Sequence, residues 1–236
     1  MEADLEFAVE LARRAGGLLM GSFGKVQRID RKSARDVVTD VDFTSEALII
    51  DAIRERFPDD GILAEESGAH AGARDAGRGA NGRVWLIDPL DGTVNYANGI
   101  PFFCVSIALA TDGRPSVGVV LDPARGDCYT ATREGPARLN GLDVHTSDKD
   151  AIADFVISLT VVGRGGLSRE RAIGREVRIP RRMGSAALAL AYVASGRFDA
   201  FVQSGGLSLW DVAAAGLIAE RGGATVSDVT GGAWFD

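Results

Sequence analysis

Apolar residues at the start of the chain recur at the spacing of an amphipathic helix. The apolar positions within the first two dozen residues are Leu5, Ala8, Val9, Ala12, Ala15, Leu19 and Phe23. A second helix is predicted to follow Thr39, because Thr39 and Asp42 have the spacing of a capping box. Its apolar stripe ends at Pro58, which stops the helix.

Shorter apolar runs further along the chain predict strands separated by turns. Strands are expected at 62–65, 84–87, 103–110 and 117–121, with the last two joined as a hairpin through residues 111–115. Helices are expected at 186–195 and 212–220, and strands at 198–203 and 224–227. The Gly-, Ala- and Arg-rich stretch 69–82 has no periodicity, so it is predicted to be a surface loop.

Composition and charge narrow the range of partners. The 236 residues are 46% hydrophobic, enough for a sizeable core, and carry a formal net charge of -7. This charge provides no broad basic surface, so neither a nucleic-acid nor a membrane partner is expected. The chain start lacks a basic secretory segment and no apolar stretch is long enough to span a bilayer, which favours a cytoplasmic protein. The apolar end leaves open whether the natural chain continues past Asp236.

The two cysteines and two histidines are not expected to carry chemistry. Cys104 and Cys128 stand among apolar residues, so buried thiols are predicted rather than a disulfide or a metal site. His70 falls in the predicted surface loop, and His145 stands beside polar residues. Both histidines are therefore expected at the surface.

The segment from Asp88 to Thr93 contains the most informative group of polar residues. Asp88 closes an apolar strand, and Pro89 keeps it extended before a tight turn. The carboxylates of Asp88 and Asp91, with the Leu90 carbonyl between them, are oxygen ligands of the kind that Mg²⁺ prefers. A helix beginning at Gly92 and Thr93 would add an anion site. Asp-Pro and Asp-Gly are also ordinary turn dipeptides, so a purely structural interpretation stays open.

Three more acidic residues occupy places where a site residue could lie. Glu65 closes the strand that begins at Ile62, Asp211 stands at the head of an apolar helix, and Asp42 opens the second helix. Each also has a structural explanation: a solvated strand end for Glu65, a helix cap for Asp211 and a charge that complements the helix dipole for Asp42.

Taken together, these segments resemble the inositol monophosphatase family. The similarity lies in Ala64-Glu65-Glu66-Ser67, in Asp88 to Asn95 and in Trp210-Asp211-Val212-Ala213-Ala214, in the order and spacing of that family's three signature motifs, and it covers nearly the whole chain. The resemblance implies a layered αβαβα sandwich of the sugar phosphatase type, assembled as a homodimer. We expect an N-terminal lobe, 1–140, with most metal ligands, and a C-terminal lobe, 141–236, with Asp211 and the substrate pocket, forming one compact catalytic unit.

The resemblance also implies a role for each matching residue. Two or three Mg²⁺ ions would be held by Glu65, Asp88, Asp91, Asp211 and the Leu90 carbonyl. The implied catalytic residues are Asp42 and Thr93, which orient and activate the attacking water, together with Glu65. The residues implied to contact substrate are Asp91, Gly92, Thr93, Gly184, Ser185, Ala186, Gln203 and Asp211.

The expected reaction is Mg²⁺-dependent hydrolysis of a phosphate monoester of a small cyclitol or sugar, by in-line attack of activated water and with inhibition by Li⁺. Gln203 stands near the place where inositol-specific members carry Glu, and the segment 162–180 is shorter than usual. Fructose-1,6-bisphosphatase, dual-specificity sugar phosphatase and histidinol-phosphate phosphatase activities therefore remain alternatives. A non-catalytic regulator that binds metal or sugar phosphate is the alternative from a different class.

Overall fold

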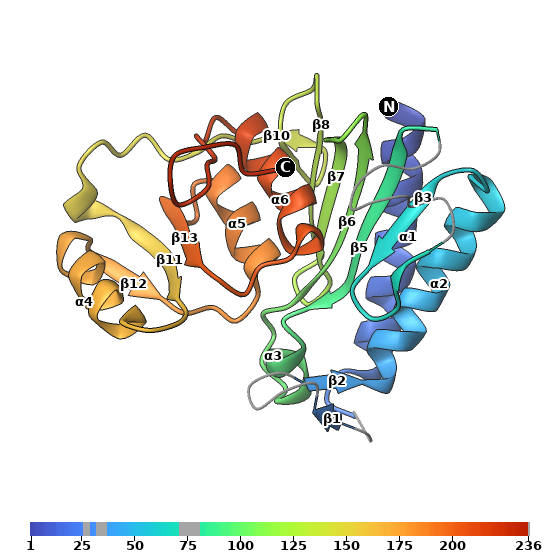
Figure 1. Ribbon diagram of the computed structural model, residues 1–236, viewed down its shortest axis with the longest axis horizontal. Helices are drawn as coiled ribbons and strands as arrows, with labels where there is room; N and C mark the ends of the chain where they lie inside the picture. Colours follow the sequence, from blue (N-terminus) through green and yellow to red (C-terminus); the bar gives the residue numbers. More distant parts are fainter. Residues whose placement is uncertain (26–28, 32–36, 71–80, 236) are drawn as a thin grey trace.

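The protein forms five alternating layers of helices and sheets, as seen across Figure 1 from right to left. The computed structural model describes residues 1–25, 29–31, 37–70 and 81–235. The outer helices are α1 (Glu2–Ser22) and α2 (Asp40–Arg56), and an eight-stranded sheet separates them from α5 (Ala186–Ala194) and α6 (Leu209–Arg221). A three-stranded sheet and α4 (Gly166–Glu176) complete the other end. The predicted αβαβα sandwich is confirmed.

The eight-stranded sheet has the order β10-β9-β8-β7-β6-β5-β3-β4. Its strands are β3 (Gly61–Ala64), β4 (Gly68–Ala69), β5 (Arg83–Asp91), β6 (Cys104–Thr111), β7 (Arg114–Asp122), β8 (Asp127–Thr132), β9 (Arg138–Leu139) and β10 (Leu142–Asp143). Among the described strands of this sheet, only β3 and β5 pair in parallel. This parallel pair brings the ends of β3 and β5 to the same edge of the sheet, which is where two of the predicted acidic segments lie.

The remaining elements are short or lie outside the large sheet. The three-stranded sheet has the order β12-β11-β13, with both pairs parallel, and a separate antiparallel pair joins β1 and β2. These elements are β1 (Ile29–Arg31), β2 (Val37–Thr39), α3 (Thr93–Ala97), η1 (Ile152–Asp154), β11 (Val156–Val161), β12 (Ile179–Arg181) and β13 (Ala200–Ser204). The predicted lobe boundary at 140/141 falls in the turn between β9 and β10, and the division into two lobes stays a prediction.

Alternating side chains of the large sheet fill two separate apolar cores. Trp85 and Ile87 pack with α1 and α2, whereas Leu86 packs with α5 and α6. The contact with α6 is close: a Cβ at Gly118 of β7 would lie 2.7 Å from the carbonyl oxygen of Ala214. Because only glycine fits there, this packing fixes α6 against the sheet and so fixes where α6 begins.

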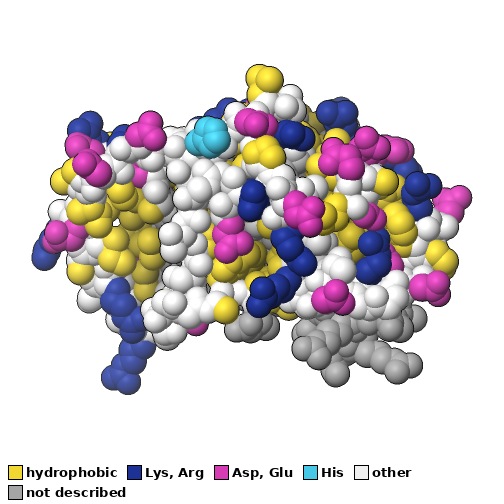
Figure 2. All heavy atoms as spheres, turned by 90° about the horizontal axis from the view of Figure 1, so that it is seen from above, with side chains coloured by type: hydrophobic (Ala, Val, Ile, Leu, Met, Phe, Trp, Pro, Cys, Tyr) yellow, Lys and Arg dark blue, Asp and Glu magenta, His cyan; other side chains and the backbone are white. Residues whose placement is uncertain are grey.

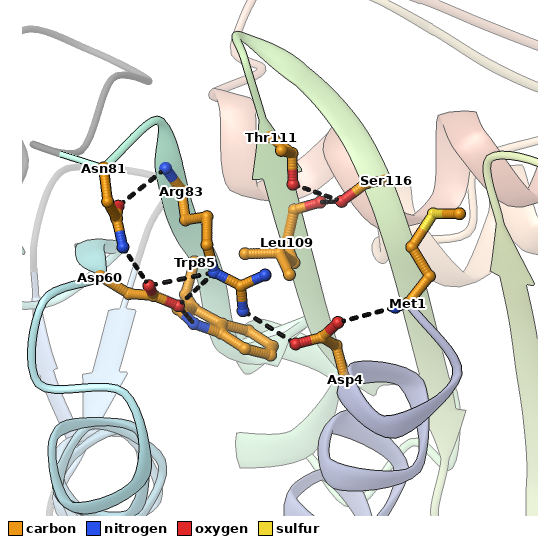
Figure 3. A network of polar contacts seen from close by, with 9 residues as sticks. All are labelled: Met1, Asp4, Asp60, Asn81, Arg83, Trp85, Leu109, Thr111 and Ser116. Carbon is orange, nitrogen blue, oxygen red and sulfur yellow. Dashed lines mark hydrogen bonds and ion pairs between the residues drawn. The ribbon is translucent and has the colours of Figure 1, made fainter.

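A polar network fixes the start of β5, at the end of the strand far from Asp88 and Asp91 (Figure 3). Asp60 accepts hydrogen bonds from Asn81 Nδ2 at 2.7 Å, Arg83 Nε at 3.0 Å and Trp85 Nε1 at 2.8 Å. Arg83 also donates to Asp4 of α1 at 2.8 Å. These bonds join α1 and the loop before β3 to the strand that carries the candidate site.

Several predictions of single elements need correction. Ala224 and Val226 pack against the apolar core, but residues 224–227 are not a strand, because no strand of the described residues pairs with them. The hairpin between β6 and β7 is confirmed, but its turn is two residues long: Asp112 and Gly113 have φ of 54° and 75°, as a tight primed turn requires. Strands β8, β11 and β12 and helix α4 were not predicted.

The structure tests the predictions for the cysteines and for a membrane span, but it describes only the ends of the predicted loop 69–82. Cys104 and Cys128 are free and buried, as predicted. Within the described residues, no helix combines the length and apolar character needed to cross a membrane. Of the predicted loop 69–82, Ala69 belongs to β4 and residues 71–80 lie outside the described residues.

Candidate metal centre and active site

An irregularity in β5 brings Asp88 and Asp91 to the same side of the sheet. The sequence predicted that this strand ends at Asp88, but β5 continues to Asp91. Asp88 pairs with Ser106 and Asp91 with Cys104, so three steps along β5 match two along β6. Side chains three residues apart in a regular strand would point to opposite faces, and the extra residue of the bulge reverses one of them. The backbone N–H of Leu90 donates to Asp88 Oδ1 at 3.0 Å and holds that carboxylate.

Asp211 reaches the same place from α6. It is the third residue of the helix and forms a reciprocal capping box with Ser208, whose backbone N–H donates to Asp211 Oδ2 at 2.6 Å. Asp211 is thus not the cap itself but its partner. Carboxylate oxygens of Asp88, Asp91 and Asp211 all lie within 4.8 Å of one another. Three of the four predicted metal-binding carboxylates therefore meet at one point.

Glu65 lies beside Asp88, just after the end of the neighbouring strand β3. It follows β3, and its backbone N–H donates to Ile87 O at 3.1 Å, which places it beside Asp88. The Glu65 side chain lies within hydrogen-bonding reach of Asp88. Glu46 of α2, itself buried, accepts from the backbone N–H groups of Glu66 and Ser67 at 2.8 and 2.9 Å. These two bonds fix the turn that carries Glu65.

The start of α5 holds Asp91 in place. Ser185 Oγ donates to Asp91 Oδ2 at 2.5 Å, and the backbone N–H groups of Ala186 and Ala187 donate to the same carboxylate at 3.2 and 2.7 Å. Free N–H groups at a helix start favour a negative charge. Ser185 and Ala186 were predicted to line the pocket for the alcohol part of a substrate, and here both donate to the Asp91 carboxylate.

The charges of this cluster call for a cation. Burial raises the pKa of Asp88 well above its ordinary value, and the nearby carboxylates of Glu65, Asp91 and Asp211 raise it further. Burial also raises the pKa of Asp91, against the bonds from α5, and that of Asp211 to about 7. In the described part of the chain, no Lys or Arg forms an ion pair with Asp88, Asp91 or Asp211. Oxygen ligands at this density suit a hard divalent ion.

Asp42 and Thr93 form a buried pair beside the cluster. Asp42 is the third residue of α2, and its Oδ2 accepts from the backbone N–H and the hydroxyl of Thr39 at 2.8 and 2.5 Å, as the predicted capping box requires. Thr93 Oγ1 lies 3.1 Å from Asp42 Oδ1 and 3.0 Å from Leu90 O. A hydroxyl that donates to either oxygen keeps its lone pairs free to accept a hydrogen bond.

Two glycines permit the close approach of these segments. Gly92 has φ of 96°, and a Cβ there would lie 3.1 Å from both Phe102 O and the Ser185 side chain. Gly184 has φ of 80°, and its Cβ would lie 2.9 Å from Asn95 Nδ2. Both positions need glycine for conformation and for space. A short helix does begin at Thr93, with Gly92 as its N-terminal cap.

The remaining predicted residues lie apart from the cluster or at the surface. Gln203 pairs with Thr160 in the three-stranded sheet, and among the described residues no hydrogen bond joins it to the acidic cluster. His145 is exposed, and His70 is partly exposed and contacts Arg54 and Ser67. The substrate role of Gln203 stays a prediction.

Sequence reasoning missed two residues that support the site. Glu46 lies four positions after Asp42, on the same face of α2, and its only signal was a charged residue at a position facing the core. Asn95 Nδ2 donates to Phe102 O at 2.7 Å and to Met183 O at 2.8 Å, which ties α3 to the segment leading into α5. Asn95 belongs to the segment that carries the family resemblance, but its two bonds to distant carbonyls could not be inferred from the sequence.

The five-layered fold with a carboxylate cluster at the end of β5 defines an α/β protein with a candidate metal centre. The chain belongs to the inositol monophosphatase family, whose model matches residues 1–236. This family is Mg²⁺-dependent in general, and the acidic cluster could bind a metal ion. The resemblance inferred from the three sequence motifs is confirmed.

Individual relatives fall under two names. The chain is 39% identical to "Nus factor SuhB" of Pseudomonas aeruginosa, over 98% of this chain and 87% of that protein. It is also 39% identical to "Inositol-1-monophosphatase" of Mesorhizobium japonicum, over 97% and 86%. The structure of the Thermotoga maritima IMPase superimposes with a TM-score of 0.88 at 34% identity, covering 98% of this chain and 87% of that one.

Proposed function

We propose that this protein is a phosphatase that uses Mg²⁺ to hydrolyse a phosphate monoester of a small cyclitol or sugar. The observation that carries the proposal is the meeting of Asp88, Asp91 and Asp211, from two distant segments, with their oxygens within 4.8 Å. Glu65 and the Leu90 carbonyl would complete a set of ligands for two or three ions. When bound, Mg²⁺ offsets the charge of the phosphate and lowers the pKa of a water molecule.

The chain's own contribution to the reaction would come from Thr93 and Asp42. The Thr93 hydroxyl would donate a hydrogen bond to Asp42, across the 3.1 Å between their oxygens, which leaves a lone pair on Thr93 Oγ1. The attacking water would give its proton to this lone pair while the Thr93 proton passes to Asp42. Asp42 is held by two bonds from Thr39 and is fully buried, so it orients Thr93 without moving itself. Water activated in this way would attack the phosphorus directly, without a covalent intermediate on the protein.

Phosphate would be held at the start of α3. Gly92 and Thr93 directly follow the end of the strand that carries Asp88 and Asp91, and the free backbone N–H groups at the start of a helix would attract an anion there. The alcohol part of the substrate would lie towards Gly184, with Gln203 as a further contact. Because Gln203 is uncharged, sugar phosphates and histidinol phosphate remain candidate substrates beside inositol phosphate.

The proposal is tested by measuring phosphate release from inositol 1-phosphate, fructose 1,6-bisphosphate, histidinol phosphate and an adenosine bisphosphate, with Mg²⁺ and with excess chelator. We expect turnover of at least one substrate only with Mg²⁺, and its loss in Asp91→Asn. Asp51→Asn serves as the control: Asp51 is an exposed carboxylate, so this variant should keep full activity. Full turnover in chelator, or an active Asp91→Asn, would refute the metal mechanism.

A regulatory role is the second candidate function, because several relatives, including those of Pseudomonas aeruginosa and Escherichia coli, carry the name "Nus factor SuhB". With relatives of that name, the prediction that this protein has no nucleic-acid partner is no longer supported. No turnover on any of the four substrates, together with retained Mg²⁺ binding, would favour this second role.

Three further properties belong to the same proposal and rest on the family alone. The protein would assemble as a homodimer, act in the cytoplasm and lose activity in Li⁺. Light scattering gives the mass in solution, and a Li⁺ titration of the phosphate-release assay at fixed Mg²⁺ tests the inhibition.

A further inference from the structure

A second concave site lies at the end of the molecule formed by α4, β11 and β12, away from the carboxylate cluster (Figure 1). The cavity has a volume of ≈ 430 Å³, within the range of small-molecule sites. Most of its polar lining is basic. The charged residues that line it are Arg171, Arg175, Arg181, Arg182 and Glu170.

The surrounding segment reverses the charge of the protein. Residues 164–182 contain seven arginines and two glutamates, a formal charge of +5, whereas the whole chain carries -7. Figure 2 shows basic side chains at this end of the molecule, including one group that extends beyond the neighbouring surface. None of the basic residues in the segment is lysine.

Most of the arginines in the cavity lack an acidic partner. Glu170 pairs with Arg182 and also accepts from the backbone N–H of Val161 at 2.7 Å, so its carboxylate is already engaged. Arg171, Arg175 and Arg181 form no ion pair with any described residue. The cavity therefore presents a net positive charge to its occupant.

The placement of Arg171 and Arg175 also points to an anion. They are four residues apart on α4, so they lie on the same face of the helix and repel each other. A bound anion would turn this repulsion into attraction. Arginine presents a planar fork of N–H donors that matches phosphate oxygens in pairs, which a lysine cannot do.

We propose that this cavity binds a small, multiply charged phosphate-type anion. A compact ligand is favoured over a nucleic-acid strand because the lining contains no aromatic side chain on which a base could stack. The site is separate from the carboxylate cluster, so the inference does not depend on the proposed phosphatase activity.

The test is isothermal titration calorimetry with inorganic tripolyphosphate on metal-free protein dialysed free of chelator. Without metal ions the carboxylate cluster repels anions, so any binding reports on another site. We expect binding that weakens as salt is raised, and weakens at least tenfold in the double variant Arg171→Ala/Arg175→Ala. Both side chains are exposed, and an unchanged melting temperature confirms that this variant is folded.

The matched control is Arg13→Ala/Arg14→Ala. These two arginines line another cavity of ≈ 490 Å³ on α1, where Glu6 and Glu10 balance their charge. The control removes the same charge from the protein and should leave binding unchanged. No binding of tripolyphosphate, or equal loss in both double variants, would overturn the proposal. An RNA 12-mer that binds more tightly than tripolyphosphate and depends on the same arginines would overturn the assignment to a compact ligand.

Discussion

Replacing Asp88 with asparagine should make the metal-free protein more stable while abolishing phosphate release. Asparagine keeps the shape and an oxygen that accepts from Leu90 N–H, but it removes one of three charges whose oxygens lie within 4.8 Å. At this distance each pair of charges costs about 3.5 kcal/mol at an effective dielectric of 20. Asp88→Asn removes two of the three pairs.

Partial protonation of the wild-type cluster relieves some of this repulsion, because the pKa of Asp88 is raised well above its ordinary value. A net gain of about 2–3 kcal/mol at pH 8 is the expected result. For a chain of this length it corresponds to a rise of roughly 4–12 °C in melting temperature. Differential scanning calorimetry of protein freed of metal ions measures it. Saturating Mg²⁺ should stabilise the wild type and leave Asp88→Asn nearly unchanged.

Asp199→Asn provides the control with the opposite sign. The Asp199 side chain is also buried, but it accepts from Lys149 Nζ at 2.7 Å and from Ser147 Oγ at 2.6 Å, and these bonds lower its pKa. Removing its charge should therefore destabilise the protein, by about 1–3 kcal/mol. If Asp88→Asn destabilises the metal-free protein as Asp199→Asn does, the carboxylates are not in electrostatic conflict and the reasoning fails.

Three other changes test the surroundings of the cluster. Ser185→Ala removes the hydroxyl donor to Asp91 and should raise the Mg²⁺ concentration for half-maximal activity by roughly 10–100-fold; Ser116→Ala, an equally buried serine that donates to a strand carbonyl, should leave it unchanged. Gly118→Ala places a methyl group against the backbone of α6 and should cost about 1–3 kcal/mol in urea unfolding. The pKa of Asp211 is raised to about 7, so its neutral form favours folding: metal-free protein should melt at a lower temperature at pH 8 than at pH 5.5, and a higher melting temperature at pH 8 would contradict this sign.

Much of the fold could be predicted from local patterns. The capping box of Thr39 and Asp42 and the apolar stripe of α1 gave the outer helices, and Asp112-Gly113 gave the central hairpin. Strand β12 and helix α4 were not predicted because β12 has only three residues and α4 has a single buried residue, Gly166. Without an apolar face there is no periodicity to read. Strand β11, with six mostly apolar residues, had a readable signal and was missed.

The residues of the candidate site could be predicted from the sequence, but their geometry could not. The strand was predicted to end at Asp88, whereas the bulge that turns Asp88 and Asp91 to one side appears only in the pairing of β5 with β6. Bulges depend on the partner strand, so a single sequence does not reveal them. The role of Ser185 was also missed in its detail, because its bond to Asp91 joins residues 94 positions apart.

The presence of an acidic residue at position 42 or 211 is a poor indicator of whether a relative still catalyses the reaction, because both residues also start a helix. Each side chain accepts from the backbone of its helix cap, so natural selection for folding alone would retain an oxygen there. Asp88 is different, because its negative charge destabilises the folded state unless a cation is present. A relative that had abandoned catalysis would be expected to drift to asparagine first at this position, which makes residue 88 the one to inspect when sorting enzymes from regulators within the family.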